Sequence, residues 1–239
     1  MTLPLRALLL AAGLGTRLRP LTLHTPKCLV PIGGEPLLGR WLRQLEAARC
    51  EAVLVNTHYL PEQVANFLQN WHSDGMAVQI VHEPELLGTA GTLLVNRSFF
   101  DGASGLLIHA DNAMAADLSG LLSAHAQRSA NCLLTMLTFQ TDQPSSCGIV
   151  ETDGQGVMIA FHEKVANPPG HCANGALYAF DTAFLDYVSN MTPTPSDFST
   201  EVIPTLLGKI QSWQTDQPYL DIGTPEALAI AQQLLELNS

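Results

Sequence analysis

Residues 8–27 read LLLAAGLGTRLRPLTLHTPK and say most about the fold of the chain. The apolar run Leu8–Ala12 has strand character and breaks at Gly13-Leu14-Gly15. Glycines lack a Cβ and let backbone N–H groups approach a phosphate chain, while Arg17 and Lys27 can neutralise its charge. A G-x-G spacing also occurs where glycines simply follow a strand, so the spacing alone leaves a plain turn open.

Two well-known phosphate loops are excluded by the residues that follow. No G-K-[ST] sequence comes after the glycines, so the segment is not a P-loop. Leu18 stands where the third glycine of the dinucleotide fingerprint belongs, which argues against a nucleotide-binding oxidoreductase.

Strand-like and helix-like patterns alternate along the first half of the chain, which predicts an α/β fold. Alternation of this kind indicates βαβ units around a mostly parallel sheet with helices on both faces, in a Rossmann-like arrangement. Ligands then bind beyond the carboxyl ends of the strands, where Gly13, His58 and Asp111 would lie. The predicted strands are 8–12, 52–56, 78–81 and 105–109, and the predicted helices are 36–48, 61–70, 91–96 and 117–129.

The second half predicts further short strands at 132–139, 148–151, 157–161 and 176–180. Asp153-Gly154 between two of them favours a hairpin, so the sheet is expected to be mixed. The pattern predicts a last helix over Pro225–Leu237 with Thr224 as its N-cap. We expect one catalytic domain over 1–239, with no C-terminal β-helix domain after it.

Composition narrows the class of protein. With 46% hydrophobic and 14% charged residues among 239, the chain is that of a globular protein. A net charge of −11 argues against nucleic-acid binding, and no apolar run approaches the roughly 18 residues of a membrane span. The start of the chain imitates a signal peptide, but cleavage would destroy the loop at 13–27. Five widely spaced cysteines favour free thiols in a reducing cytoplasm.

The longer string G-x-G-T-R-x-x-P-x-T-x-x-x-P-K over 13–27 closely resembles the signature loop of the sugar-1-phosphate nucleotidyltransferases, the NDP-sugar pyrophosphorylases. Five more elements are similar to that family in the same order, so the resemblance runs from residue 6 to about 232. It implies the nucleotide-diphospho-sugar transferase type of fold. The five elements similar to the family are 85–91 (ELLGTAG), 106–112 (LLIHADN), 161–164 (FHEK), 173–178 (ANGALY) and 219–225 (YLDIGTP).

The sequence departs from the family pattern at two points. His109-Ala110 stands before Asp111 where the family often has Asn-Gly, and Ala replaces one glycine of the 173–178 element. Taken alone, Asp111 is also typical of a turn cap, and Glu163-Lys164 of a solvated charge pair.

The resemblance implies a role for each matching residue. Arg17 and Lys27 would be catalytic, stabilising the triphosphate and the leaving group, and Asp111 and Asp221 would hold Mg²⁺. The implied nucleotide-binding residues are Ala11, Ala12, Gly13, Gly15, Thr16, Glu85, Gly88 and Thr89. The implied sugar-phosphate-binding residues are Asn112, Gly148, Glu163, Lys164, Asn174 and Gly175.

The family activity joins a nucleoside triphosphate (NTP) and a sugar 1-phosphate into a nucleotide sugar and releases pyrophosphate. The segments 88–91 and 23–27 resemble those of mannose- or manno-heptose-1-phosphate guanylyltransferases, so GTP is the predicted nucleotide. The alternatives are a uridylyl- or thymidylyltransferase, and a non-catalytic subunit that senses nucleotide sugars. The sequence leaves a homo-oligomer open.

Overall fold

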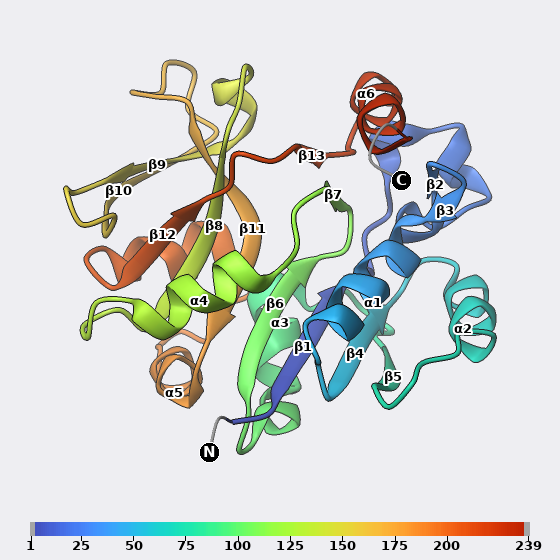
Figure 1. Cartoon of the computed structure of the whole chain (residues 1–239), viewed down its shortest axis with the longest axis horizontal. Coiled ribbons are helices and arrows are strands. Elements are labelled where there is room, and N and C mark those ends of the chain that lie inside the picture. The colour runs from blue at the N-terminus through green and yellow to red at the C-terminus, as the bar shows by residue number, and fades with distance from the viewer. Residues whose placement is uncertain (1–2, 237–239) are drawn as a thin grey trace. The chain divides into compact units, whose positions relative to one another are not determined.

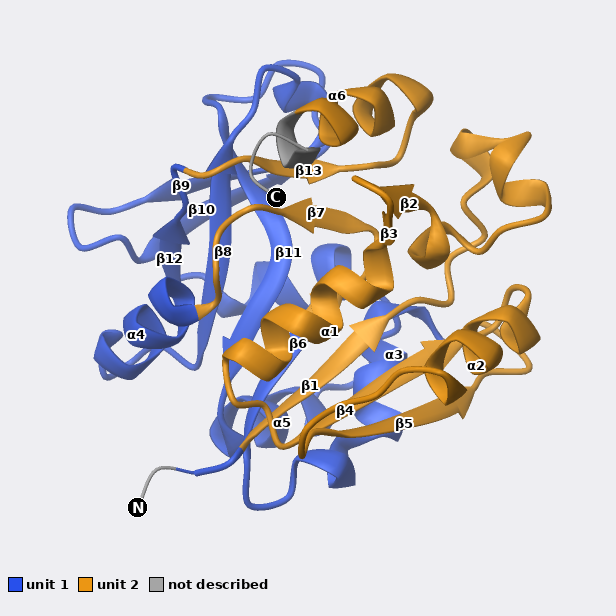
Figure 2. Ribbon diagram, turned by 45° about the vertical axis from the view of Figure 1, so that its right-hand side comes forward, with its two compact units in different colours: residues 1–4, 87–107, 119–216 blue, residues 5–86, 108–118, 217–239 orange. Residues whose placement is uncertain are grey.

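In the computed structural model, which describes residues 3–236, the chain forms two compact units. Figure 2 shows them in two colours: unit 1 comprises residues 1–4, 87–107 and 119–216, and unit 2 comprises 5–86, 108–118 and 217–239. Each unit is therefore assembled from segments that are far apart in the sequence. The expectation of a single domain stays a prediction.

Unit 2 is built on three parallel strands in the order β1 (Leu5–Leu10), β4 (Ala52–Thr57) and β5 (Ala77–His82) (Figure 1). All six residues of β4 are buried, as expected for a parallel strand covered on both faces. The crossovers contain α1 (Leu37–Ala47) and α2 (Pro61–Gln69). The predicted elements are confirmed here, although β1 begins at Leu5 and ends before Ala11.

Helix α1 shows why the sequence folds this way. Leu38, Trp41, Leu42 and Leu45 recur at helical spacing and are at most 1% exposed. Trp41, expected in the core, also donates its Nε1–H to the carbonyl oxygen of Asn112 at 2.9 Å. The helix therefore fixes the backbone just after the predicted metal ligand.

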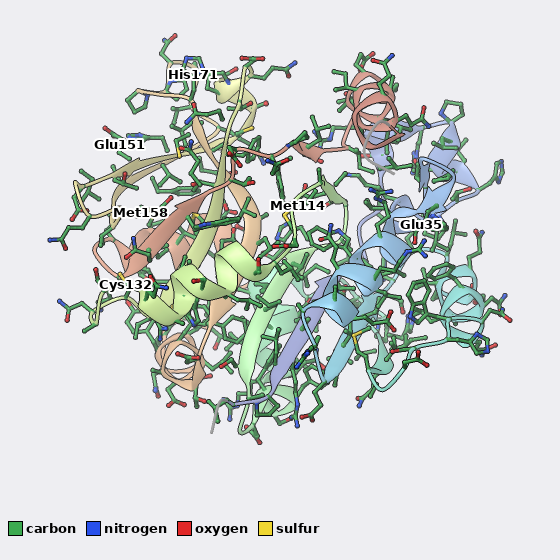
Figure 3. The ribbon with its side chains drawn as sticks, viewed as in Figure 1. Glu35, Met114, Cys132, Glu151, Met158 and His171 are labelled. Atoms are coloured by element: carbon green, nitrogen blue, oxygen red, sulfur yellow. The ribbon has the colours of Figure 1, made fainter. Side chains whose placement is uncertain are left out.

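Two short antiparallel ladders complete unit 2. Strand β7 (Asn112–Met114) pairs with β13 (Tyr219–Asp221), and β2 (Pro31–Ile32) pairs with β3 (Glu35–Pro36). Figure 3 labels Met114 on β7, whose carbonyl accepts from Gln44 Nε2 at 3.0 Å. The helix α6 (Pro225–Glu236) follows, capped as predicted by Thr224 Oγ1, which accepts from the Ala227 N–H at 3.2 Å. Leu237, the predicted last residue of this helix, lies outside the described residues.

Unit 1 holds an antiparallel group of strands. The strands of this group are adjacent in the order β10 (Met158–Glu163), β9 (Gly148–Thr152), β11 (Cys172–Phe180) and β6 (Ser104–His109). Strand β6 continues from this unit into unit 2. Strand β8 (Leu134–Gln140) pairs with β11, and β12 (Ile210–Gln214) runs parallel to β8. The predicted hairpin is confirmed: Asp153 Oδ1 accepts from the backbone N–H of Gln155 and of Val157, each at 2.9 Å.

Three α-helices are described in unit 1, and two of them were predicted. The sequence predicted α3 (Gly88–Val95) as a shorter helix and α4 (Ser119–Gln127) as a longer one. Helix α5 (Thr182–Ser189) was not predicted, although its buried residues Phe184, Leu185 and Val188 recur at helical spacing. A single π-helical turn, Phe198–Val202, follows the loop at 191–196.

Candidate active site

The loop that follows β1 has the backbone expected for anion binding. A Cβ added at Gly13 would meet no atom within 4 Å, so the backbone there is open to a ligand. Gly15 has φ +61°, and a Cβ there would lie 3.0 Å from Thr22 Cγ2. Only glycine therefore suits position 15. At the start of this loop Ala11 and Ala12 are buried, whereas Thr16 is exposed.

Lys27 joins the two predicted metal carboxylates, both in unit 2. Its Nζ donates to Asp111 Oδ2 at 2.6 Å and to Asp221 Oδ1 at 3.3 Å. The lysine side chain is only 8% exposed, whereas those of Asp111 and Asp221 are 36% and 51% exposed. The buried cation thus contacts two carboxylates whose side chains are partly exposed. We call these three residues the aspartate–lysine cluster.

The β7–β13 ladder explains why residues 110 positions apart converge. Asp221 is the register partner of Asn112, and the Ile222 N–H donates to the Asp111 carbonyl at 3.3 Å. Asp111 lies two residues after the end of β6, so the ladder brings the end of that strand to the segment before α6.

Arg17 lies on the same cluster. Its Nη2 is 3.6 Å from Asp221 Oδ2, and a Cβ at Gly223 would lie only 2.6 Å from that nitrogen. The absence of a side chain at position 223 therefore makes room for the guanidinium.

The charge state of the cluster follows from its geometry. Burial opposes the charged form of Asp111, but the Lys27 ammonium and, secondarily, His109 hold the pKa of this carboxyl below its usual value. Burial raises the pKa of the neighbouring Cys28 thiol to about 12, so Cys28 is no nucleophile at neutral pH.

The donor set fits a hard divalent cation. Carboxylate oxygens are the ligands that Mg²⁺ takes from proteins, and it commonly adds substrate phosphates and water to one or two of them. Asp111 and Asp221 offer such oxygens around one shared cation. Within residues 3–236, no three His, Cys, Asp or Glu side chains form a metal-binding group.

In unit 1, the predicted sugar-side residues come from three neighbouring strands. Glu163 ends β10 beside Gly148 of β9, where a Cβ would collide with the Glu163 carboxylate. Lys164 has φ +49°, and its Nζ lies 3.2 Å from Glu163 Oε1. With 66% of the lysine side chain exposed, the pair has the geometry of a solvated ion pair.

Asn174 lies in an irregular part of β11. Its Oδ1 accepts from the Ala176 N–H and its Nδ2 donates to the Tyr178 hydroxyl, both at 2.8 Å. The register of β11 shifts between Asn174 and Tyr178, and Ala176 has φ +51°. This is the position where the sequence carries alanine in place of a family glycine, and Gly175 is buried beside it.

The predicted nucleoside loop is divided between the units. Exposed Glu85 belongs to unit 2, and Gly88 and Thr89 begin α3 in unit 1. Thr89 Oγ1 accepts from the Phe198 N–H at 2.7 Å, and Gly88 has φ +78° against the backbone of Ser196. Asn112, predicted to contact the sugar phosphate, is 5% exposed on β7.

Comparison with known proteins decides the family. The family model described as "Nucleotidyl transferase" matches residues 6–237. The chain belongs to this nucleotidyl transferase family.

Relatives of the chain support the same family. It is 31% identical over 226 residues to a mannose-1-phosphate guanylyltransferase of Mycobacterium tuberculosis, covering 92% of this chain and 61% of that protein. It is 30% identical to the mannose-1-phosphate guanylyltransferase catalytic subunit beta of Drosophila melanogaster, with 92% and 60% covered. The chain thus spans about three fifths of the length of these curated relatives.

Solved structures of low sequence identity share the fold. A Bacillus anthracis protein assigned as a glucose-1-phosphate thymidylyltransferase superposes with a TM-score of 0.84 at 21% identity, covering 97% of this chain and 95% of that one. HddC from Yersinia pseudotuberculosis, complexed with GMP-PN, gives 0.78 at 21% identity, with 95% and 98% covered. The predicted α/β class with a mixed, mostly parallel sheet is confirmed.

Sequence reasoning missed two polar residues near the loop. Asn56 and Glu83 are each 3% exposed in unit 2. The available signal was an asparagine at the end of the otherwise apolar run Ala52–Val55.

Proposed function

We propose that this protein transfers a nucleotidyl group from an NTP to a sugar 1-phosphate, giving a nucleotide sugar and pyrophosphate. The observation that carries the proposal is the aspartate–lysine cluster with Arg17 beside it, in a chain that belongs to the nucleotidyl transferase family. Two carboxylates and two cations next to a glycine loop are suited to a polyphosphate.

The chemistry needs charge neutralisation more than proton transfer. An anionic oxygen of the sugar phosphate attacks the α-phosphorus; the new O–P bond forms as the bond from the α-phosphorus to the bridging oxygen breaks, and pyrophosphate leaves with that electron pair. The nucleophile is already deprotonated, so no general base is required. The protein contributes position and countercharge.

Each residue of unit 2 has a place in this scheme. The loop amides around Gly13 and Gly15 would bind phosphate oxygens, and Arg17 and Lys27 would bind the triphosphate and the leaving pyrophosphate. Members of the family generally use a divalent metal. Asp111 and Asp221 would hold this metal, for which we propose Mg²⁺, and when bound it would add positive charge at the phosphate oxygens.

Residues of unit 1 would bind the second substrate. Lys164 would bind the sugar phosphate, and Glu163 and Asn174 would bind sugar hydroxyls. Gly148 and Gly175 would allow a close approach of the backbone.

We infer GTP and a manno-configured sugar 1-phosphate as the substrates. Support comes from the relatives named mannose-1-phosphate guanylyltransferase in Mycobacterium tuberculosis and Drosophila melanogaster. Exposed Glu85 would read the base. A site that hydrogen-bonds one base edge leaves its own groups unpaired when another base enters, so strong discrimination is expected.

The cellular location and the oligomeric state of the protein remain predictions. The five cysteines are free, which agrees with a reducing cytoplasm as the proposed location. Among the helices described, none combines the length and the apolarity that a membrane crossing needs. A homo-oligomer stays open.

The test is pyrophosphate release with GTP, ATP, UTP and dTTP, each paired with mannose, manno-heptose, glucose and N-acetylmuramic acid 1-phosphates, with Mg²⁺ present or withheld. The proposal expects the highest kcat/KM for GTP with a manno-configured sugar. A preference for UTP or dTTP would overturn the guanylyl assignment alone. Tight nucleotide-sugar binding without turnover for any pair would instead indicate a sensing subunit.

A further inference from the structure

One carboxamide interrupts the apolar interior of unit 2. Asn56 lies in β4, a strand whose six residues are all buried, and is itself 3% exposed. A buried polar side chain is costly unless its hydrogen-bonding groups are satisfied. The partners of Asn56 therefore show what its side chain does.

Asn56 connects a backbone amide to a buried carboxylate. Its Oδ1 accepts from the Ala11 N–H at 2.7 Å, and its Nδ2 donates to Glu83 Oε1 at 3.0 Å. An N–H group can only donate, so the atom facing Ala11 must be the carboxamide oxygen. The Nδ2 group must then face Glu83, whose carboxylate is an acceptor.

The backbone of Glu83 is fixed on both sides. Its N–H donates to the Thr57 carbonyl at 2.8 Å, and its own carbonyl lies 2.8 Å from His58 Nδ1. Glu83 is 3% exposed, so its carboxylate has little freedom to turn away from Asn56. The carboxylate thus orients the carboxamide.

Ala11 is the first residue beyond β1. The parallel register of β1 with β4 ends with Leu10 opposite Asn56, and the Leu10 carbonyl accepts from the Ala110 N–H at 3.1 Å. The next backbone N–H, that of Ala11, is bound by the Asn56 side chain instead of by the backbone of β4. The open glycine Gly13 follows two residues later.

We infer that Asn56, oriented by Glu83, is a positioning residue that fixes the start of the phosphate loop, residues 11–17, for the triphosphate. This inference rests on the proposed function. The side chain touches no substrate; it acts through the Ala11 amide, which sets the course of the backbone toward Gly13 and Gly15.

The sharpest test reverses the polarity of the pair. Asn56→Asp alone places two carboxylates together, and we expect the KM for the NTP to rise about tenfold or more, with the KM for the sugar 1-phosphate within twofold. In the double variant N56D/E83Q, the Asp oxygen still accepts from Ala11 and the Gln amide donates back. We expect that variant to return to within about threefold of the wild-type KM for the NTP.

Thr57→Val is the matched control. Thr57 is the next residue of β4, is 1% exposed, and its hydroxyl donates to the Val81 carbonyl at 3.4 Å, away from the loop. It should lower Tm without changing the KM for the NTP. Asn56→Leu should raise that KM and also speed hydrogen exchange of the Ala11 amide.

The outcomes separate this inference from the proposed function. If wild type releases no pyrophosphate with any substrate pair, the proposed function fails, and exchange at Ala11 together with GTP titration still decides the role of Asn56. If wild type is active, an unchanged KM for the NTP in Asn56→Leu overturns the inference. Failure of N56D/E83Q to recover relative to Asn56→Asp, or an equal rise in KM for Thr57→Val, also overturns it.

Discussion

Each unit contains a cluster of carboxylate and cation, and the two clusters differ in how their oxygens are used. In unit 1, Asp181 Oδ2 pairs with Arg128, while its Oδ1 accepts from Ser104 Oγ at 3.1 Å and lies 3.5 Å from His125 Nε2. In unit 2, Asp221 has Lys27 at 3.3 Å and Arg17 at 3.6 Å. Arg128 and Asp181 are 53 residues apart in the sequence, whereas Lys27 and Asp221 are 194 residues apart.

The difference indicates different roles. Arg128 also donates to the carbonyls of His125 and Cys132, at 2.6 and 2.9 Å, so the unit 1 cluster ties α4 to the start of β8. The contacts of Asp221 with its two cations, at 3.3 and 3.6 Å, are longer than the contact of Asp181 with Arg128, and half of the Asp221 side chain is exposed. We therefore assign the unit 1 cluster to stability and the aspartate–lysine cluster to ligand binding.

The largest expected effect is on turnover. Asp111→Asn or Asp221→Asn removes one negative charge with almost no change of volume, so we expect kcat to fall by about a hundredfold or more. Circular dichroism should change little, because Lys27 keeps one of its two carboxylate partners in either variant. Steady-state pyrophosphate release checks this. Wild-type turnover in Asp221→Asn would remove this residue from the metal site.

The second prediction separates the two substrates. Arg17→Ala should raise the KM for the NTP about tenfold, and Lys164→Ala should do the same for the sugar 1-phosphate, since each loses one charged hydrogen bond of about 1.5 kcal/mol. Each variant serves as the control for the other. Unchanged sugar-phosphate kinetics in Lys164→Ala would show that Glu163-Lys164 is only a solvated pair.

The residues that sequence predicted best are those with a local signal. The 13–27 string and the strand–helix alternation up to α4 rest on periodicity and glycine spacing, which neighbouring residues determine. β12, with the sequence IQSWQ, lacks an alternating pattern and forms through parallel pairing with β8. It was missed for that reason.

Long-range contacts explain what sequence could not supply in the site. Lys27 was predicted to bind phosphate, and in the structure its ammonium joins Asp111 and Asp221, which are 84 and 194 residues away. Asn56 and Glu83 depend equally on the packing of parallel strands. No local sequence pattern indicates contacts between residues so far apart in the chain.

A smaller effect should distinguish the cluster of unit 1. Asp181→Asn should lower the free energy of unfolding by about 1–2 kcal/mol, a modest loss because a third of the Asp181 side chain is exposed and solvent screens the ion pair. Both KM values should stay unchanged. Chemical denaturation measures the difference. A large loss of turnover at full stability would contradict the assignment.

The same variant has a defined pH dependence. The polar contact with His125, and further the Arg128 pair, hold the pKa of Asp181 well below its usual value. A lowered pKa means that the stabilisation is present above the unfolded value of about 3.9 and is lost as pH falls toward the folded one. The stability gap between wild type and Asp181→Asn should be constant above about pH 5 and shrink below about pH 4.

The smallest effect concerns the helix after Asp221. Thr224→Ala removes the cap of α6 and should cost about 1 kcal/mol, with kcat within twofold of wild type. Thr224→Ser, which keeps the hydroxyl, is the control. A larger loss of activity than of stability would mean that the cap also positions Asp221.

Isotope transfer tests the central claim most directly. The protein would be incubated with GTP, Mg²⁺ and mannose 1-phosphate carrying ¹⁸O in its non-bridging phosphate oxygens. The masses of the products would then be measured by mass spectrometry. The account predicts a nucleotide sugar that retains all of that ¹⁸O, unlabelled pyrophosphate in equal amount, and neither product from Asp111→Asn. Release of GMP with the sugar phosphate unconsumed, or equal product from Asp111→Asn, would contradict it.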